Sequence, residues 1–187
     1  MGIYLETDRL VLRQFTEDDV DNIVELDSDP VVMRYLTGGR ATPVEEVRDE
    51  VLPFWLAYYE RGEEVGFWAA IDKATGHFLG WFHFRPRSRD PESGVELGYR
   101  LRRDAWGKGY ATEGSLALIR KGFTELGVER VFAETMAVNA GSRRVMEKAG
   151  LRYVRTFHQE WPEQIPGDEH GDVEYALTRS EWQAAAG

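Results

Sequence analysis

The sequence predicts one domain of the α/β class, in the α+β arrangement, with helices on both faces of a single mixed sheet. The chain has 187 residues, a length typical of one domain, so residues 1–187 are expected to form one unit. Hydrophobic residues make up 42% and aromatic residues 12% of the chain, which is enough to bury a core. The patterns follow the order β-α-α-α-β-β-β-α-β-α-β-β, which differs from the regular alternation of a doubly wound parallel sheet.

The first third of the chain is predicted to form one strand and three helices. Apolar and polar residues alternate over Leu5–Phe15, as in a half-buried strand. Thr16 then offers a helix N-cap, with an acidic residue three positions later. The helical stretches are Val20–Leu26, Asp29–Leu36 with Pro30 in its first turn, and Pro43–Gly62 with a kink or break at Pro53.

The rest of the chain turns to strands and then alternates. Aromatic and β-branched residues, separated by turn-rich segments, predict three strands: Gly66–Asp72, His77–Pro86 and Glu92–Arg102. Apolar and small residues at helical spacing predict a long helix over Gly109–Gly127. The last predicted elements are the strand Val128–Met136, the helix Asn139–Gly150 and the strands Leu151–Trp161 and Val173–Arg179.

Charge and composition narrow the classes of function. The 23 basic residues are outnumbered by 33 acidic ones, so the net charge of −10 disfavours a nucleic-acid partner and suits a cationic amine. The chain has no cysteine, which excludes a disulfide framework, a thiol nucleophile and a cysteine zinc site. The four histidines lack metal-ligand spacing, so we expect no metal. No apolar leader or membrane-spanning run is present, so we expect a soluble, cytoplasmic protein without a membrane partner.

The segment "RRDAWGKGYATEG" is a candidate anion site, because it lies between a predicted strand and the start of a predicted helix. A helix start presents unpaired N–H groups and the positive end of the helix dipole. Gly107 and Gly109 would let the backbone approach a phosphate closely, and Arg102, Arg103 and Lys108 add positive charge. Three interpretations stay open from these residues alone: a plain turn, a pyrophosphate cradle, and a dinucleotide-binding G-x-G-x-x-G motif whose third glycine is replaced by threonine.

Three segments together resemble the GNAT family of acyl-CoA-dependent N-acetyltransferases, in order and over almost the whole chain. They are "TDRLVLRQFTEDDVDNIVELDSDPVVMRYL", "ELGYRLRRDAWGKGYATEG" and "VNAGSRRVMEKAGLRYV". The resemblance is strongest to the branch of RimJ and RimL, which acetylate the N-termini of ribosomal proteins. It implies a mixed, mostly antiparallel sheet of about six to seven strands flanked by helices, with a splayed strand pair that binds CoA.

The resemblance also implies which residues bind the cosubstrate, acetyl-CoA. The pyrophosphate loop of the family falls on Trp106–Ala111, where Trp106 replaces the usual Gln or Arg and keeps only its backbone donor. The pantetheine arm should follow the strand "VELGYRL", in which Gly98 fits a bulge or a close approach of the ligand. The residues expected to bind CoA are Leu97, Gly98, Tyr99, Leu101, Arg102, Arg103, Trp106, Gly107, Lys108, Gly109, Tyr110, Ala111, Thr112, Asn139 and Ser142.

The catalytic residues are expected in three places. Asn139 and Ser142 match the N-x-x-S of the family; taken alone they favour ordinary capping of a helix, whereas the resemblance implies that they have both roles. Many relatives carry a tyrosine acid in this helix, but Met146 stands nearby here, so Ser142 is the expected acid. Glu96 and His83 are the candidate bases, and a solvated or structural role is the alternative for each. Weaker candidate bases on neighbouring strands are Glu134, His158 and Glu160.

The function implied by the resemblance is acetyl transfer to a primary amine. A neutral amine would attack the thioester of acetyl-CoA directly in a ternary complex, and a backbone N–H would stabilise the oxyanion. The acceptor would be a protein N-terminus, an amino acid or another small amine, and the protein a monomer or a homodimer. The alternatives are a non-catalytic CoA-binding sensor or interaction module and, less favoured, an NAD(P)-binding Rossmann-type protein.

Overall fold

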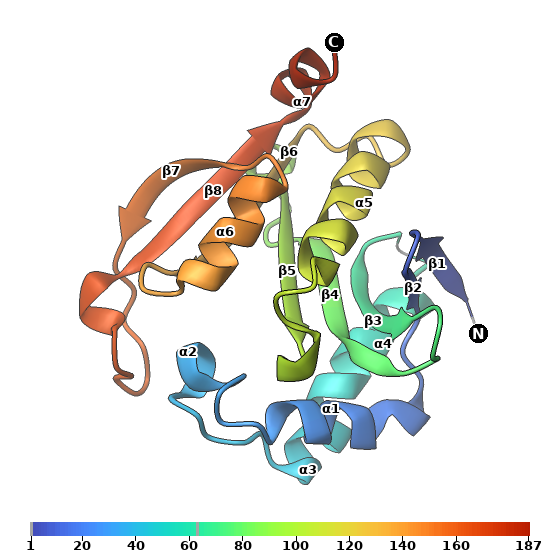
Figure 1. Cartoon of the computed structure of the whole chain (residues 1–187), viewed down its shortest axis with the longest axis vertical. Helices are drawn as coiled ribbons and strands as arrows, with labels where there is room; N and C mark the ends of the chain where they lie inside the picture. The colour runs from blue at the N-terminus through green and yellow to red at the C-terminus, as the bar shows by residue number, and fades with distance from the viewer. Residues whose placement is uncertain (1, 63) are drawn as a thin grey trace.

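The protein is described by a computed structural model that covers residues 2–62 and 64–187, and its centre is one eight-stranded sheet (Figure 1). The strand order is β1-β2-β3-β4-β5-β6-β8-β7. Among the described residues only β5 and β6 pair in parallel, and every other neighbouring pair is antiparallel. The strands are β1 (Ile3–Glu6), β2 (Leu10–Arg13), β3 (Gly66–Asp72), β4 (Phe78–Pro86), β5 (Val95–Leu101), β6 (Arg130–Met136), β7 (Arg152–Phe157) and β8 (Asp172–Thr178).

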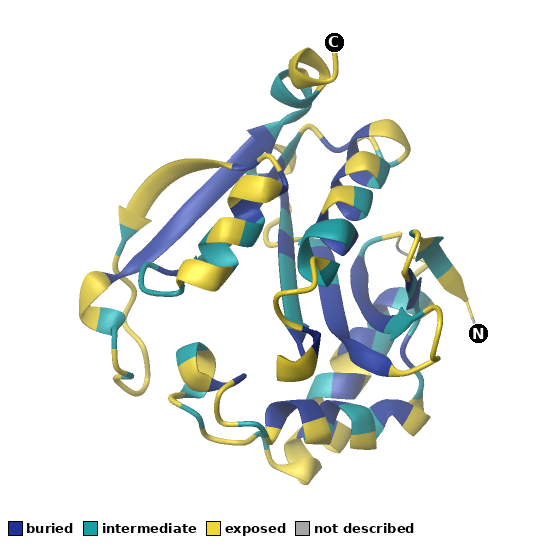
Figure 2. Cartoon of the chain, viewed as in Figure 1, coloured by how far each residue is buried: buried dark blue, intermediate teal, exposed yellow. Residues whose placement is uncertain are grey.

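Helices cover both faces of the sheet, as the sequence predicts. On one face α5 (Tyr110–Thr124) and α6 (Ala140–Lys148) pack on a core that contains Phe82, Phe84 and Val131 (Figure 1). On the other face a second core joins α1 (Val20–Asp27) and α4 (Leu52–Glu60) to β3 and β4. Figure 2 shows the strands of the centre mostly buried and the helices exposed along one side. The mostly antiparallel sheet excludes the Rossmann-type alternative, which requires successive parallel strands.

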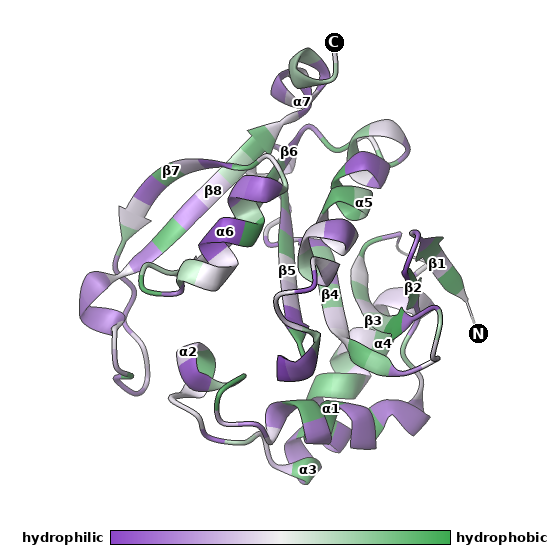
Figure 3. Ribbon diagram, viewed as in Figure 1, coloured by the Kyte–Doolittle hydropathy of each residue, from purple (hydrophilic) through white to green (hydrophobic). Residues whose placement is uncertain are grey.

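Hydropathy along the helices follows from this layered arrangement. In Figure 3 hydrophobic and hydrophilic segments alternate along α5 and α6, because each helix buries one stripe and exposes the other. Leu118 and Ile119 of α5 and Met146 of α6 are buried in the core. No helix of the described residues is long and apolar enough to cross a membrane.

The parallel pair β5 and β6 separates soon after it begins. The two strands pair only at Val95 with Val131 and at Glu96 with Phe132. The remaining residues of β5 and β6 continue without pairing to each other, so the strands splay toward the ends that lead to α5 and α6. This confirms the predicted splayed pair and places it at the middle of the sheet.

Several of the predicted elements have different limits in the structure. The predicted strand Leu5–Phe15 is divided into β1 and β2, because Thr7 turns the chain: its N–H donates to the carbonyl of Leu10 at 2.9 Å and its hydroxyl accepts from Leu10 N–H at 2.9 Å. This hairpin brings the sheet to eight strands, more than the six to seven expected.

The helices after α1 are also shorter than predicted. In the predicted helix Asp29–Leu36 the first residues form turns, and α2 occupies Arg34–Thr37. The predicted helix Pro43–Gly62 consists of α3 (Val44–Glu46), a π-helical segment (Val47–Val51) and α4, and the π-helical segment ends two residues before Pro53. A proline cannot donate to the preceding turn, which accounts for the break there.

The helix α7 (Arg179–Ala185) was not predicted. Its start has a capping box, in which the side chains of Thr178 and Glu181 each accept a hydrogen bond from the backbone N–H of the other residue. The sequence "TRSE" carries this signal, so the helix could have been found.

Candidate active site

The glycine-rich segment forms the connection between β5 and α5. A single 3-10 turn, Arg103–Ala105, follows β5, and α5 begins at Tyr110. Gly107 (φ 71°) and Gly109 (φ 83°) both adopt left-handed backbone conformations, which side chains other than glycine rarely tolerate. The two glycines therefore allow the chain to turn sharply into the helix.

This connection presents a row of free backbone donors. Within the described part of the chain, nothing accepts a hydrogen bond from the N–H groups of Gly107 through Thr112. These donors lie at the positive end of the α5 dipole, which favours a bound anion. The backbone of the predicted pyrophosphate loop thus fits a phosphate group, since its hydrogen-bonding capacity is otherwise unused.

Most side chains of the loop are engaged by other residues of the protein and not by the space beside the free N–H groups. Arg102 pairs with Glu25 at 2.8 Å, and Arg103 pairs with Asp29 at 3.2 Å, so both arginines tie the loop to the end of α1 and the turn after it. The Trp106 indole donates to the Leu101 carbonyl at 2.9 Å.

Tyr110 and Lys108 of the loop differ in whether another residue of the described chain engages their side chains. The Tyr110 hydroxyl donates to Asp72 at 3.3 Å. The Lys108 ammonium has no partner among residues 2–62 and 64–187, so it is the one basic side chain of the predicted set that is available to a ligand.

The edge of β5 that faces the splay carries the predicted pantetheine contacts. Arg102 N–H donates to the Leu79 carbonyl at 2.8 Å, which sets the alternation of the β4–β5 ladder. The backbone groups of Leu97, Tyr99 and Leu101 consequently point toward β6, where the strands have separated. They are in place for the amides of an extended ligand, Leu101 through its N–H alone, because its carbonyl already accepts from the Trp106 indole.

The bulge considered at Gly98 is absent, because the β4–β5 register runs without a shift. Glycine is required there because the ring of His83 lies against its Cα. A Cβ at Gly98 would lie 2.4 Å from Cε1 of His83, whose ring covers this position.

Ser142 and Tyr99 meet across the splay. The Tyr99 hydroxyl, from β5, lies 3.1 Å from the Ser142 hydroxyl and 3.1 Å from the Ser142 carbonyl, at the start of α6. Asn139 caps α6, since its Oδ1 accepts from Ser142 N–H at 3.2 Å, and Met146 is buried in the core. The structure therefore brings the Tyr99 hydroxyl to Ser142 from β5, whereas from the sequence a tyrosine was considered only in the helix α6.

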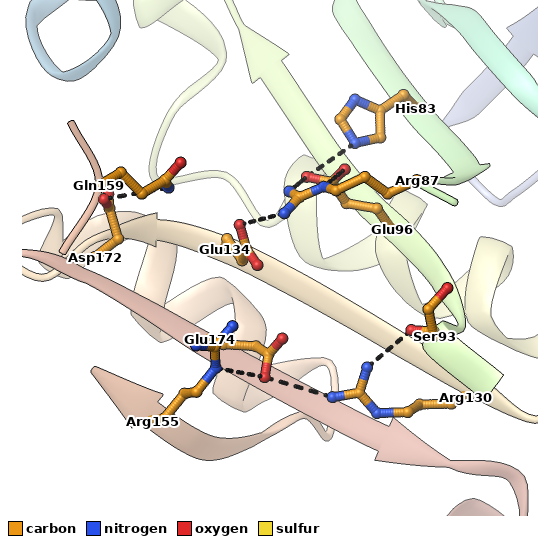
Figure 4. Close-up of polar contacts among 10 residues, drawn as sticks. All are labelled: His83, Arg87, Ser93, Glu96, Arg130, Glu134, Arg155, Gln159, Asp172 and Glu174. Carbon is orange, nitrogen blue, oxygen red and sulfur yellow. Dashed lines mark hydrogen bonds and ion pairs between the residues drawn. The ribbon is translucent and has the colours of Figure 1, made fainter. Parts of the chain in front are cut away.

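An arginine bridges β5 and β6 on the opposite face of the sheet, near the point where the strands separate (Figure 4). Arg87 donates to both carboxylate oxygens of Glu96, at 2.6 and 3.1 Å, and to Oε2 of Glu134 at 2.7 Å. Both carboxylates are nearly buried, with 12% and 10% of their side-chain surfaces exposed. In the described chain Oε1 of Glu134 accepts no hydrogen bond, whereas both oxygens of Glu96 are engaged.

Burial and neighbouring charges give these groups different proton affinities. Burial raises the pKa of Glu134; Arg87 opposes this, and the carboxylates of Glu96 and Glu174 add to the rise. Burial alone would lower the pKa of Arg87, but its hydrogen bonds to the two glutamates outweigh this and raise it. Arg87 thus stays charged, and Glu134 holds a proton more readily than an ordinary glutamate.

His83 is a buried, neutral imidazole. Burial lowers its pKa to about 4; Glu96 opposes this effect, and Arg85, Arg87 and Arg100 add to it. Its ring is packed between Trp81 and Phe67 at centroid distances of 5.9 and 5.4 Å, and Nε2 lies 3.8 Å from Glu96. A base with so low a pKa takes few protons at neutral pH, which favours the structural role for His83.

The remaining candidates lie outside the Arg87 cluster. The exposed His158 ring lies near Gly171, and Glu160 is exposed in the loop after β7. A second network on β6, β7 and β8 joins Arg130 and Arg155 to Glu174, at 3.5 and 3.4 Å (Figure 4). Within residues 2–62 and 64–187 no three His, Asp or Glu side chains are grouped as a metal site.

Sequence reasoning missed Arg87 and the hydroxyl of Tyr99. Arg87 directly follows β4 in "FRPRS", and a basic residue after a strand is too common to be singled out. Tyr99 was selected for its backbone alone. Its contact with Ser142 joins residues 43 positions apart and depends on the placement of α6 over β5.

Comparison with known proteins finds matches among acetyltransferases. Residues 9–152 match the family described as acetyltransferase (GNAT) domain. The chain is 36% identical over 184 residues to the FsC-acetyl coenzyme A-N(2)-transacetylase of Aspergillus fumigatus, a match that covers 95% of this chain and 77% of that protein.

Solved structures agree in fold. An acetyltransferase of the GNAT family from Bacillus anthracis is 27% identical, with a TM-score of 0.74 and coverage of 97% of this chain and 100% of its own. RimL, a ribosomal L7/L12 alpha-N-protein acetyltransferase in complex with coenzyme A, has a TM-score of 0.78 with coverage of 96% and 99%. Its identity to this chain is 19%, so it indicates the fold alone.

Proposed function

Because this chain belongs to the acetyltransferase (GNAT) family and is an acetyl-CoA-dependent N-acetyltransferase, we propose that it acetylates a primary amine by direct attack in a ternary complex. The observation that supports the proposed site is the splay of β5 and β6 directly beside the free N–H groups at the start of α5. Acetyl-CoA supplies the activated acetyl group. The splay offers an extended path from the α5 connection to Ser142.

The donor would be held mainly by backbone. The N–H groups of Gly107 through Thr112 would surround the pyrophosphate, with Lys108 as the available cation. The backbone groups of Leu97, Tyr99 and Leu101 would pair with the pantetheine amides. Arg102 and Arg103, which are already paired with acids, would hold the shape of the loop.

We assign the base to Glu134, in place of Glu96 or His83. An attacking amine must first lose a proton, and an N-terminal amine with a pKa of about 8 requires modest help. Glu134 has a free oxygen and a raised pKa, whereas Arg87 occupies both oxygens of Glu96. Arg87 would keep Glu134 oriented and limit the rise in its pKa.

We assign the proton donor for the departing thiolate to the Ser142 hydroxyl. Burial raises the pKa of Tyr99 to about 12, so its phenol stays protonated. When its single proton is donated to the Ser142 hydroxyl and not to the Ser142 carbonyl, the serine proton is free to point into the splay. A backbone N–H of β5 at the splay would stabilise the oxyanion, a contribution of roughly 3 kcal/mol per donor.

The acceptor class is proposed from charge and from the relatives. A net charge of −10 suits a cationic amine, and the relative from Aspergillus fumigatus is named as an N(2)-transacetylase. Because that protein is more similar in sequence than RimL, we favour an acceptor of the kind that an N(2)-transacetylase acetylates over a ribosomal protein N-terminus. We also propose that the protein belongs to the branch of RimJ and RimL. It would be cytoplasmic, and a monomer or a homodimer.

The test is thiol release from acetyl-CoA against a panel of small diamines, amino acids and N-terminal peptides. We expect turnover with at least one class, and kcat lowered at least about tenfold in Glu134→Gln and Ser142→Ala. Glu129→Gln, at an exposed glutamate next to β6, is the matched control and should keep full activity. Full activity of Glu134→Gln, with the loss appearing in Glu96→Gln instead, would overturn the assignment of the base.

A further inference from the structure

The turn between β1 and β2 is hydrogen-bonded to the first helical turn of α5. The Glu113 carboxylate accepts from the Thr7 hydroxyl at 2.7 Å, from Arg9 N–H at 2.9 Å and from Arg9 Nε at 2.7 Å. The Arg9 guanidinium also lies over the Tyr110 ring, 4.3 Å from its centroid. Residues more than 100 positions apart in the sequence are thus held together by one carboxylate and one guanidinium.

Arg9 also fixes one peptide of the glycine-rich connection. Its Nη1 donates to the Lys108 carbonyl at 2.8 Å, from the side of the β1–β2 turn. In a trans peptide the C=O and the following N–H point in opposite directions. The N–H of Gly109 must therefore point away from Arg9, toward the open side of the connection, and Arg9 determines the direction of a donor that it does not touch.

The ion pair also controls the charge at the start of α5. Glu113 lies in the first turn of the helix, where an unpaired carboxylate would repel a bound phosphate. Burial alone would raise the pKa of Glu113, but the hydrogen bonds from Thr7 and Arg9 lower it, so the group is ionised at neutral pH. Arg9 neutralises this charge with contacts as short as 2.6 Å.

The β1–β2 turn is itself anchored to the sheet. The Arg9 carbonyl accepts from Lys73 N–H at 2.8 Å, and the Thr7 carbonyl accepts from the Lys73 ammonium at 3.0 Å. The guanidinium therefore acts from a fixed support, although 43% of its side-chain surface is exposed.

We propose that Arg9 and Glu113 are positioning residues that hold the Trp106–Ala111 connection in the conformation that binds the pyrophosphate of CoA. The inference rests on the CoA site of the proposed function and deepens it. It gives a role to the segment "TDRLVLR", which the sequence marks as characteristic but which contributes no residue to the proposed chemistry.

The test compares a ligand that has the pyrophosphate with one that lacks it. Calorimetry gives Kd for CoA and for pantetheine, and steady-state kinetics give kcat/KM for acetyl-CoA and S-acetylpantetheine. In Arg9→Met we expect CoA to bind on the order of tenfold more weakly, with pantetheine within about twofold of the wild type. The double variant Arg9→Met with Glu113→Gln should bind CoA more tightly than Arg9→Met alone, because it removes the uncompensated carboxylate.

Controls separate positioning from general stability. Lys121→Met removes another ion pair of α5, the one with Glu125 at 2.8 Å, and should leave both affinities unchanged. Arg9→Lys keeps the charge but loses the geometry of the guanidinium, so it should show a smaller loss that is again confined to CoA. It serves as the test if Arg9→Met does not fold.

The outcomes distinguish the inference from the proposed function. Unchanged CoA affinity in folded Arg9 variants, or equal losses for CoA and pantetheine, would overturn the positioning role. A wild-type protein that binds CoA no better than pantetheine would instead overturn the phosphate site itself.

Discussion

The buried imidazole of His83 makes a quantitative prediction about stability and pH. The substitution His83→Gln removes the titrating group and keeps a polar side chain of similar length. In the wild type the folded protein holds the imidazole neutral, because burial lowers its pKa from 6.5 to about 4. The unfolded chain takes up a proton near the ordinary value, so the wild type loses stability as pH falls from about 6.5 toward about 4.

The size of the effect follows from the difference between the two pKa values. That difference corresponds to about 3 kcal/mol in all, of which about 2.5 kcal/mol should be lost between pH 7.5 and 4.5. Glu134 and Asp172 act in the opposite direction, since raised pKa values favour the folded state as the pH falls. The difference between wild type and variant isolates His83, because both proteins share these groups.

Urea unfolding at half-unit pH steps measures the free energy of unfolding of both proteins. Below pH 6.5 the free energy of unfolding of the wild type should fall more steeply than that of His83→Gln. Between pH 7.5 and 4.5 the wild type should lose about 2.5 kcal/mol relative to the variant. His77→Gln, at an exposed histidine before β4, should keep the wild-type slope. Parallel curves for wild type and His83→Gln would refute the account of a neutral, buried imidazole.

Two further variants test the surroundings of the splay. Gly98→Ala should destabilise the fold by about 1–3 kcal/mol in urea unfolding, since its Cβ would lie 2.4 Å from the His83 ring; a neutral result would show that the ring moves freely. The matched control Gly141→Ala, whose Cβ would have nothing nearer than 3.9 Å, should stabilise α6 by up to about 1 kcal/mol. Tyr99→Phe removes the bond to Ser142 and should lower kcat about tenfold while KM for acetyl-CoA stays within about twofold; unchanged kcat would remove Tyr99 from the reaction.

The fold could be predicted from local patterns to a large extent. Strands such as β3 are continuous runs of apolar residues between turns, and α5 shows its buried stripe directly in the sequence. The division of Leu5–Phe15 into β1 and β2 was missed because the turn at residues 7–9 contains no glycine or proline to mark it. What turns the chain there is the side chain of Thr7, which also reaches Glu113, a tertiary contact that no local pattern reports.

The candidate site also has one part that could be predicted from the sequence and another that could not. The loop from Trp106 to Ala111 could be found because its glycines lie between a strand and a helix and because the family resemblance favours a pyrophosphate cradle over the other two interpretations; the structure shows its backbone donors free. The catalytic groups were harder to rank, because their character depends on burial and partners. Glu96 and Glu134 are similar in the sequence, and they differ only because Arg87 occupies both oxygens of one and a single oxygen of the other.

A crystal structure with bound CoA tests the central proposal most directly. We expect the pyrophosphate within hydrogen-bond distance of several N–H groups between Gly107 and Thr112, and the sulfur between β5 and β6 beside the Ser142 hydroxyl. A pyrophosphate held by side chains away from this connection, or a sulfur on the far side of α6, would contradict it.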